Sequence, residues 1–252
     1  MIINAPDSAQ IPALRRLWQQ AFGDSEQFLD IFFETAYSPD RCRCVIVDDQ
    51  LAAALYWFDC RLDSHRYAYL YAVATDSAYQ NRGLCKALLD NTHRHLFELG
   101  YAGTVLVPGE ASLFQFYKQA GYRMFGFVDE FSYSAASSPV SLRVIDSKTY
   151  ADLRKDLLPA GGLLQDGETL AFLRRFSQFY AGDGFLLAAT LENQTLTVHE
   201  YLGDPALAPA IVAALRAESG RFRRPGKGKP FAMFYPLVSN APVPTYLGLA
   251  LD

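Results

Sequence analysis

The chain has 252 residues, of which 50% are hydrophobic and 14% aromatic, so it holds enough apolar material for one large core or two smaller ones. Its 27 Asp and Glu side chains outnumber 23 Lys and Arg side chains, a net charge of −4 that argues against a general nucleic-acid binder, which usually presents a basic face. The first residues contain no charged leader, and no stretch of about 18 apolar residues could span a bilayer, so we expect a soluble, cytoplasmic protein without a membrane partner.

The first 75 residues predict two helices and a series of strands. Apolar residues recur at helical spacing over 10–22 and again in the segment from Ser25 to Ser38. Short polar turns separate the apolar runs that follow, which is typical of strands joined in sequence. The expected strands are 2–3, 42–47, 51–61 and 66–75.

The next segment combines a polar turn, one glycine and the start of a helix. It reads Gln80-Asn81-Arg82-Gly83-Leu84-Cys85, and apolar residues then follow one stripe of a helix over 84–99. A helix start leaves backbone N–H groups without internal partners, and its dipole favours negative charge. Gly83 lets a ligand approach the backbone closely, and Arg82 adds positive charge. The segment therefore predicts a phosphate site, although it matches neither the dinucleotide fingerprint nor the Walker loop.

A second block follows at the end of a strand predicted over 103–107. It comprises a helix over 110–120 that carries Tyr117, then Gly121-Tyr122 and a strand over 122–134. The run from Gln80 to Cys85 resembles the Q/R-x-x-G-x-G/A signature of the GNAT acetyltransferases, which bind acetyl-CoA. The second block resembles the later motif of that family. The resemblance covers roughly residues 1–134 and implies the family's order β-α-α-β-β-β-α-β-α-β.

The resemblance also implies which residues hold acetyl-CoA. The backbone of Val73, Ala74 and Thr75 would pair with the pantetheine arm, and an amide of that strand would donate to the thioester oxygen. Ser112 and Leu113 would flank the lower pantetheine. Main-chain N–H groups of the loop and helix start would surround the diphosphate, namely those of Gln80, Asn81, Arg82, Gly83, Leu84, Cys85 and Lys86.

The catalytic residues are predicted less completely. A tyrosine at the position of Tyr117 protonates the leaving thiolate in the family, so Tyr117 is the expected general acid. The base is not identified, because 70–75 contains no acid or histidine, and Asp59, Asp63 and His65 read as strand-end and turn chemistry. In the Eis-like branch of the family the terminal carboxylate assists, which makes Asp252 a candidate; a water relay is the alternative.

Several other side chains carry interpretations of their own. Cys85 stands where the loop usually ends in Gly or Ala, and Glu110 stands where many members carry an asparagine that touches pantetheine. His93 is expected on the exposed side of its helix, and His199 reads as a structural residue within a strand. The remaining aromatics of interest could line an acceptor pocket but read mainly as core: Phe32, Phe33, Trp57 and Phe58.

The cysteines do not form a metal motif or a disulfide framework. Cys42 and Cys44 have strand spacing, and no second pair follows. With Cys60 and Cys85 they read as buried free thiols, and no metal is expected.

Residues 135–139 read as a small, polar linker that ends in proline, and a second set of elements follows. No phosphate loop succeeds the strand at 195–202; instead Asp204 caps the start of the next helix. We therefore expect a mixed α/β fold, in which 1–134 is a GNAT domain that binds acetyl-CoA and 140–252 is a degenerate GNAT-like domain, a tandem similar to the Eis-like branch. The second set comprises strands at 140–145, 184–192, 195–202, 231–235 and 245–251, and helices at 147–158, 167–181 and 204–219.

The run from Arg221 to Pro230 carries five positive charges and reads as a solvated, flexible loop. Contact with the acidic first half or with a ligand phosphate stays open as the alternative.

The sequence thus predicts an acetyl-CoA-dependent N-acetyltransferase that transfers an acetyl group to a primary amine of a small molecule or peptide. A non-catalytic acetyl-CoA sensor or scaffold is the alternative, which the missing base favours. Aminoglycosides, polyamines, amino acids, peptide N-termini and lysines are all open as acceptors. Nucleic acid is not expected as a partner, and because related folds often dimerise, a homodimer is one to consider.

Overall fold

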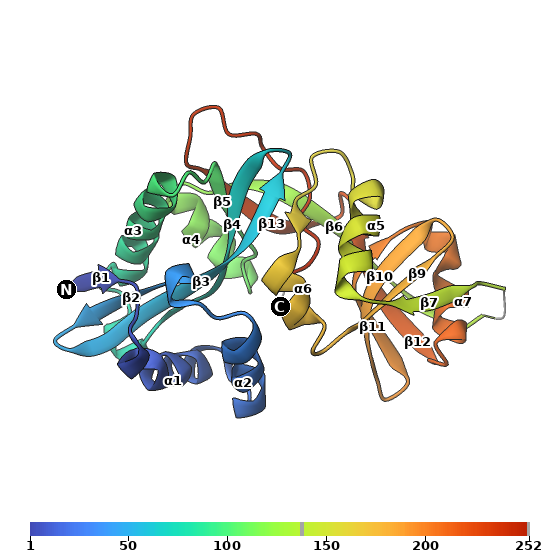
Figure 1. The fold of residues 1–252 in the computed structure, drawn as a ribbon, viewed down its shortest axis with the longest axis horizontal. Helices are drawn as coiled ribbons and strands as arrows, with labels where there is room; N and C mark the ends of the chain where they lie inside the picture. Colours follow the sequence, from blue (N-terminus) through green and yellow to red (C-terminus); the bar gives the residue numbers. More distant parts are fainter. Residues whose placement is uncertain (137–138, 251–252) are drawn as a thin grey trace.

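The computed structural model describes residues 1–136 and 139–250 (Figure 1). Its strands form one mixed sheet of 13 strands in the order β1-β2-β3-β4-β5-β13-β6-β12-β11-β10-β9-β7, and β8 pairs with β3 outside this path. Parallel pairs (β4 with β5, β11 with β12) occur among antiparallel ones, so the expected mixed α/β class is confirmed. The strands are β1 (Ile2–Asn4), β2 (Cys42–Val47), β3 (Gln50–Leu62), β4 (His65–Thr75), β5 (Gly103–Leu106), β6 (Arg123–Ser134), β7 (Leu142–Ile145), β8 (Leu164–Gln165), β9 (Gln178–Gly182), β10 (Phe185–Glu192), β11 (Thr195–Leu202), β12 (Ser219–Pro225) and β13 (Lys229–Pro236).

The helices of the first half cover both faces of its sheet. Leu14 and Trp18 of α1 pack in one core cluster with residues of α2, whereas Leu88 of α3 and Tyr117 of α4 pack in another on the opposite face. Gly23 ends α1 with a φ of 74°, a left-handed conformation that glycine adopts without strain, and the chain turns at once into α2. The α-helices are α1 (Ile11–Phe22), α2 (Glu26–Thr35), α3 (Leu84–Glu98), α4 (Ala111–Gln119), α5 (Ser147–Leu157), α6 (Gly167–Leu173) and α7 (Ala208–Ala214).

The first half follows the expected element order, but the second half departs from it in several places. The helix expected over 167–181 ends at Leu173, and the chain continues as strand β9. The helix expected over 204–219 is shorter, a 3₁₀ turn followed by α7. The strand expected over 245–251 is absent from the described residues 245–250, which form a buried segment with a single bridge between Tyr246 and Gly162.

The basic run is not the flexible loop we expected: it contains the end of β12 and the start of β13, which pair with opposite edges of β6. Asp129 of β6 accepts from the backbone N–H groups of Lys227 and Gly228, at 3.1 and 3.0 Å, and so fixes the turn between β12 and β13. Glu130 lies 3.5 Å from Arg223 Nε and 3.0 Å from Lys229 Nζ. The carboxylates of β6, far away in sequence, thus organise these positive charges.

The last strand of the chain belongs to the sheet of the first half. β13, expected in the second domain, inserts between β5 and β6 and pairs with both (Figure 1). One core cluster also contains residues of both halves, among them Trp18, Phe172 and Tyr246. The proposed boundary at residue 134 stays a prediction, but the two halves share strands and core.

Helix α6 and strand β8 hold the second half against the first. β8 pairs with Cys60 and Arg61 at the end of β3. Glu168 of α6 accepts from the backbone N–H of Asp59 at 2.9 Å. These contacts place α6 beside α2 and close to the end of β4, where the candidate site lies (Figure 1).

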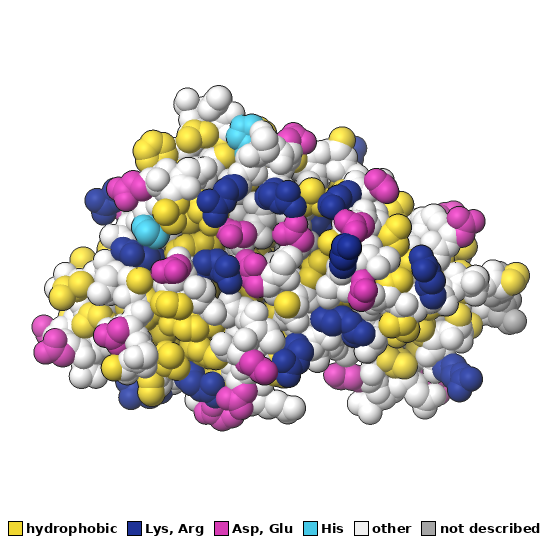
Figure 2. All heavy atoms as spheres, in the orientation of Figure 1, with side chains coloured by type: hydrophobic (Ala, Val, Ile, Leu, Met, Phe, Trp, Pro, Cys, Tyr) yellow, Lys and Arg dark blue, Asp and Glu magenta, His cyan; other side chains and the backbone are white. Residues whose placement is uncertain are grey.

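The surface shown in Figure 2 carries Lys and Arg side chains interspersed with Asp and Glu, without one large patch of either sign. In the part of the chain that the structure describes, no helix is both long enough and apolar enough to cross a bilayer.

Candidate active site

Strand β4 is paired on only one side over its second half. It pairs with β3 almost throughout, but with β5 only from Tyr67 to Tyr69. Beyond Tyr69 the two parallel strands separate, and β4 has no ladder with β5. A bulge interrupts the register toward β3 at this point, and Ala72 has a φ of 47°, in the left-handed region. Bulges re-aim backbone groups next to functional sites, and the sequence offered no glycine to predict this one.

The polar loop after β4 leads to an open helix start. Asn81 and Gly83 have φ values of 61° and 74°, and α3 then begins without a side-chain cap from any residue the structure describes. No acidic residue lies in its first turn. A Cβ added at Gly83 would meet no atom within 4 Å, so packing does not require this glycine. The conformation of the loop requires it instead, and the space leaves room for an anion at the helix start.

The side chains of this loop contact neighbouring protein groups, which leaves the backbone N–H groups available to a ligand. Arg82 lies over the Tyr79 ring, with 5.1 Å from Cζ to the ring centroid. Lys86 Nζ lies 2.7 Å from Asp90 Oδ2, and Gln80 donates to the carbonyl of Thr75 at 3.4 Å. The arrangement fits the predicted role of these residues, in which the main-chain N–H groups and one exposed guanidinium supply the positive potential.

The departures from the family pattern have local explanations. Cys85 packs against the core below α3, and burial raises the pKa of its thiol to about 11, so it is protonated at neutral pH and acts as a small apolar residue. Cys42, Cys44 and Cys60 are buried free thiols, as predicted. Ser112 donates to the Glu110 carboxylate at 2.5 Å, so these two side chains hold each other at the start of α4.

Tyr117 lies on α4 and faces the cavity with little solvent exposure, 7%. Its ring packs against Phe116 and Tyr122, with centroids 5.2 and 5.6 Å apart. Burial raises the pKa of Tyr117 above its ordinary value of 10, and Cys85 adds to the effect. The hydroxyl therefore keeps its proton at neutral pH, as a general acid must.

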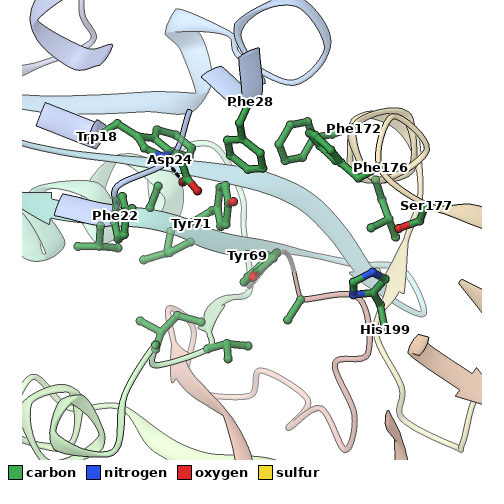
Figure 3. A pocket seen from close by; sticks show the side chains of 18 of the residues that line it. Trp18, Phe22, Asp24, Phe28, Tyr69, Tyr71, Phe172, Phe176, Ser177 and His199 are labelled. Atoms are coloured by element: carbon green, nitrogen blue, oxygen red, sulfur yellow. Dashed lines mark hydrogen bonds between the residues drawn. The ribbon is translucent and has the colours of Figure 1, made fainter. Parts of the chain in front are cut away.

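A cavity of about 860 Å³ opens between the two halves beside β4. From the first half, Val73, Leu113 and Tyr117 line it, together with rings of α1, α2 and β4. The second half contributes Phe172, Phe176, Ser177 and His199 to the lining (Figure 3). The whole lining is Trp18, Phe22, Asp24, Phe28, Tyr69, Leu70, Tyr71, Ala72, Val73, Leu106, Val107, Gly109, Leu113, Tyr117, Phe172, Leu173, Arg175, Phe176, Ser177, Thr190, Glu192, Thr197, His199 and Ala250.

The polar end of the cavity is a chain of hydrogen bonds in the second half. Thr190 Oγ1 lies 3.1 Å from the carbonyl of Phe176, to which only the hydroxyl can donate. His199 Nε2 lies 2.9 Å from the same Thr190 oxygen, so Nε2 is the donor of that contact. Ser177 Oγ lies 3.2 Å from Thr190 Oγ1. His199 therefore donates from Nε2 to Thr190, and these hydrogen bonds hold the imidazole in the cavity wall.

The structure brings only some of the predicted site residues to the cavity, and Ala74, Thr75 and Ser112 are not part of the described lining. Val73, Leu113 and Tyr117 line the cavity, and the residues from Gln80 to Lys86 form the loop and helix start beside the open edge of β4. Asp252 lies outside the described residues, although Ala250 lines the cavity. Asp59, Asp63 and His65 are not part of the described lining.

Two expectations about other side chains are now settled. His93 is buried rather than exposed: it is 6% exposed, and Nε2 lies 2.8 Å from Tyr122 Oη. The aromatics interpreted as core are core, since Phe32, Phe33, Trp57 and Phe58 belong to the apolar clusters.

The residues that the sequence did not reveal come from the second half. Phe172 and Phe176 lie within the helix predicted over 167–181, and His199 alternates with buried neighbours in a strand, so each reads as ordinary packing. Only the fold brings them to β4. Within the described residues, no group of three or more His, Cys, Asp or Glu side chains could hold a metal ion.

Comparison with known proteins agrees with this architecture. The family model of the GNAT acetyltransferase domain matches residues 3–125. A comparison with curated proteins found no match. The fold is similar to a GCN5-related N-acetyltransferase from Anabaena variabilis, with 16% identity and a TM-score of 0.76 over 94% of this chain and 73% of that one. It is also similar to Eis1 from Mycobacterium abscessus, with 11% identity and a TM-score of 0.69 over 94% of this chain and 74% of that one. It is similar as well to a putative acetyltransferase from Pyrococcus horikoshii, with 14% identity and a TM-score of 0.64 over 98% of this chain and 93% of that one. The expected fold is confirmed, and these similarities extend over both halves.

Proposed function

The first half of this chain belongs to the GNAT superfamily of acetyltransferases, and on that premise we propose that the protein transfers an acetyl group from acetyl-CoA to a primary amine. One observation carries the proposal. Strand β4 joins the parts of the proposed site: its Val73 lines the cavity that contains Tyr117, its edge is not paired with β5 beyond Tyr69, and the chain after it leads to the uncapped start of α3. An extended thioester substrate needs such an arrangement, with an anion site at one end and a proton donor at the other.

The parts of acetyl-CoA would be held in that order. The diphosphate would accept from main-chain N–H groups between Asn81 and Lys86, where the helix dipole and Arg82 add positive potential. The pantetheine arm would lie along 73–75 of β4, where the strand edge is open toward β5. The thioester oxygen would accept from an amide near the bulge at Ala72, an oxyanion-hole contact.

The chemistry then requires two proton transfers. The amine nitrogen forms a bond to the acetyl carbon, and the bond from that carbon to sulfur breaks. Asp252 or a water relay would take the proton that the amine loses, and Tyr117 would give a proton to the departing thiolate.

Binding and turnover can be tested separately. At 100 times its dissociation constant, acetyl-CoA should stabilise the folded protein by about 2.7 kcal/mol, measured as a thermal shift. Release of free CoA thiol in the presence of amines then measures turnover. Absence of a thermal shift would refute the proposal. A shift without thiol release from any amine would identify the protein as a sensor instead.

A further inference from the structure

We propose that the acceptor is a monoamine with a flat aromatic or similarly apolar body, and not a polycation. The inference rests on the proposed function and concerns the remainder of the same cavity. The part beside Val73 and Tyr117 would receive the thioester, so the rest must receive the acceptor. Aromatic rings from α1, α2, β4 and the second half gather in that part, as Figure 3 shows.

The rings form a continuous wall. Trp18 lies 5.5 Å from Tyr71 and 6.2 Å from Phe28, measured between centroids. Phe28 stacks on Phe176 at 5.0 Å with an interplanar angle of 26°, and Phe172 meets both edge-on at 5.4 and 5.2 Å. A further flat group can stack or pack edge-on against such a wall, which suits an aromatic ring better than a hydrated chain of amines.

The wall is held in place before any ligand arrives. Trp18 is 2% exposed and Phe172 1%, so each ring is fixed by the core behind it. Asp24, half-buried in the loop between α1 and α2, accepts from Trp18 Nε1 at 2.7 Å and fixes the indole further. Because the wall is preorganised, little side-chain ordering opposes ligand binding.

The charges of the lining favour a cation of low charge. Asp24 and Glu192 contribute carboxylates, whereas Arg175 is already paired with Glu34 at 3.2 Å. These carboxylates and the faces of the rings attract an ammonium group. They are too few to neutralise a polyamine or an aminoglycoside with three or more positive charges, which would lose hydration against the aromatic wall.

The experiment compares acceptors of matched amine chemistry. Thiol release from acetyl-CoA is measured with 2-phenylethylamine, propylamine, spermidine and an aminoglycoside. We expect kcat/KM to be at least about tenfold higher for 2-phenylethylamine than for propylamine, since even one methylene in an apolar pocket changes kcat/KM by about 10-fold or more. If kcat/KM is highest with spermidine or the aminoglycoside, the inference is overturned but the proposed function is left intact.

Variants test which cavity residues recognise the acceptor. Phe176→Leu should reduce kcat/KM for 2-phenylethylamine more than for propylamine, and Asp24→Asn should reduce it for both, because Asn keeps an acceptor for Trp18 but loses the charge. Phe97→Leu is the matched control, since Phe97 lies on α3, is 56% exposed and is absent from the described lining. The acetyl-CoA thermal shift should be the same in all of them. Equal losses for both amines in Phe176→Leu would contradict the aromatic site.

Discussion

The role of Tyr117 depends on one hydroxyl group whose surroundings keep it protonated. Tyr117→Phe keeps the ring packing against Phe116 and Tyr122 but removes the proton donor. We expect turnover to fall by roughly 10²- to 10⁴-fold, while the acetyl-CoA thermal shift is unchanged. Because burial raises the pKa of Tyr117, the wild-type rate should show no alkaline loss from this group below about pH 10.

A second tyrosine serves as the control for this measurement. Tyr133 is 41% exposed and is not among the described residues that line the cavity, so Tyr133→Phe should leave turnover and binding unchanged. Equal turnover in Tyr117→Phe and wild type would exclude the acid role.

At the scale of elements, the start of α3 is the feature on which cofactor binding depends. Arg82→Glu would place an acid beside the diphosphate at a helix N-terminus, where each unit charge contributes up to about 1 kcal/mol. We expect the dissociation constant of acetyl-CoA to rise about tenfold at low salt, and less at high salt because of screening. Arg94→Glu, on the same helix but more than two turns further along, should have little effect, and equal weakening by both variants would contradict a local contact.

The packing of α3 against the sheet should depend on pH through His93. Burial lowers the pKa of His93 to about 4, against an ordinary 6.5, with Asp90 opposing the shift and Lys86 adding to it. Between these values the unfolded chain binds a proton that the folded chain does not, so stability falls as the pH decreases from 6.5 to 4. The contribution amounts to about 3 kcal/mol.

Urea unfolding at several pH values measures this contribution. Other carboxylates also titrate in the same range, so the informative quantity is the difference between wild type and His93→Gln. The variant should lose about 3 kcal/mol less than wild type between pH 7 and pH 4. Parallel curves would show that His93 is not held neutral by the fold.

Local patterns predicted the first half well because its element boundaries carry local signals. Gly23 and Gly83 mark helix ends with positive φ, and the apolar stripes continue to those points. The boundaries that were missed in the second half lack such signals. No glycine or proline separates α6 from β9, and Arg216, a residue rarely found with positive φ, makes the turn after α7 at 57°.

The candidate site divides in the same way. The phosphate loop and Tyr117 lie in contiguous motifs, so the sequence indicated them. The bulge at Ala72 and the rings of Phe172 and Phe176 depend on contacts between distant segments. The basic run was misread for the same reason, because Asp129 and Glu130 lie 98 and 99 residues before the lysines that they contact.

At the scale of the whole molecule, a buried ion pair holds the last described segment in place. Arg154 and Glu200 are fully buried, with 2.7 Å between Nε and Oε2, and Arg154 also donates to the carbonyl of Leu163. The tail follows this pair closely: a Cβ added at Gly248 would lie 1.7 Å from Glu200 Oε1. Hydrogen bonds in both directions join Gln165 to the backbone of Leu249. The tail then continues to Ala250 in the cavity wall.

Arg154→Met should therefore disturb both stability and the cavity. Removing one partner leaves the Glu200 carboxylate buried without its cation, which costs about 3 to 5 kcal/mol. For a chain of this size we expect the melting temperature to fall by about 10 °C. Arg154→Met combined with Glu200→Met removes the stranded charge as well, so the double variant should melt closer to wild type. If the single and double variants lose the same stability, the cost is one of packing and not of charge.

Acetyl-CoA should still stabilise both variants, because the start of α3 makes no contact with this pair. Thiol release should nevertheless fall in both, since neither keeps the intact ion pair against which Gly248 packs. Wild-type turnover in the double variant would show that the tail reaches its place in the cavity without the ion pair.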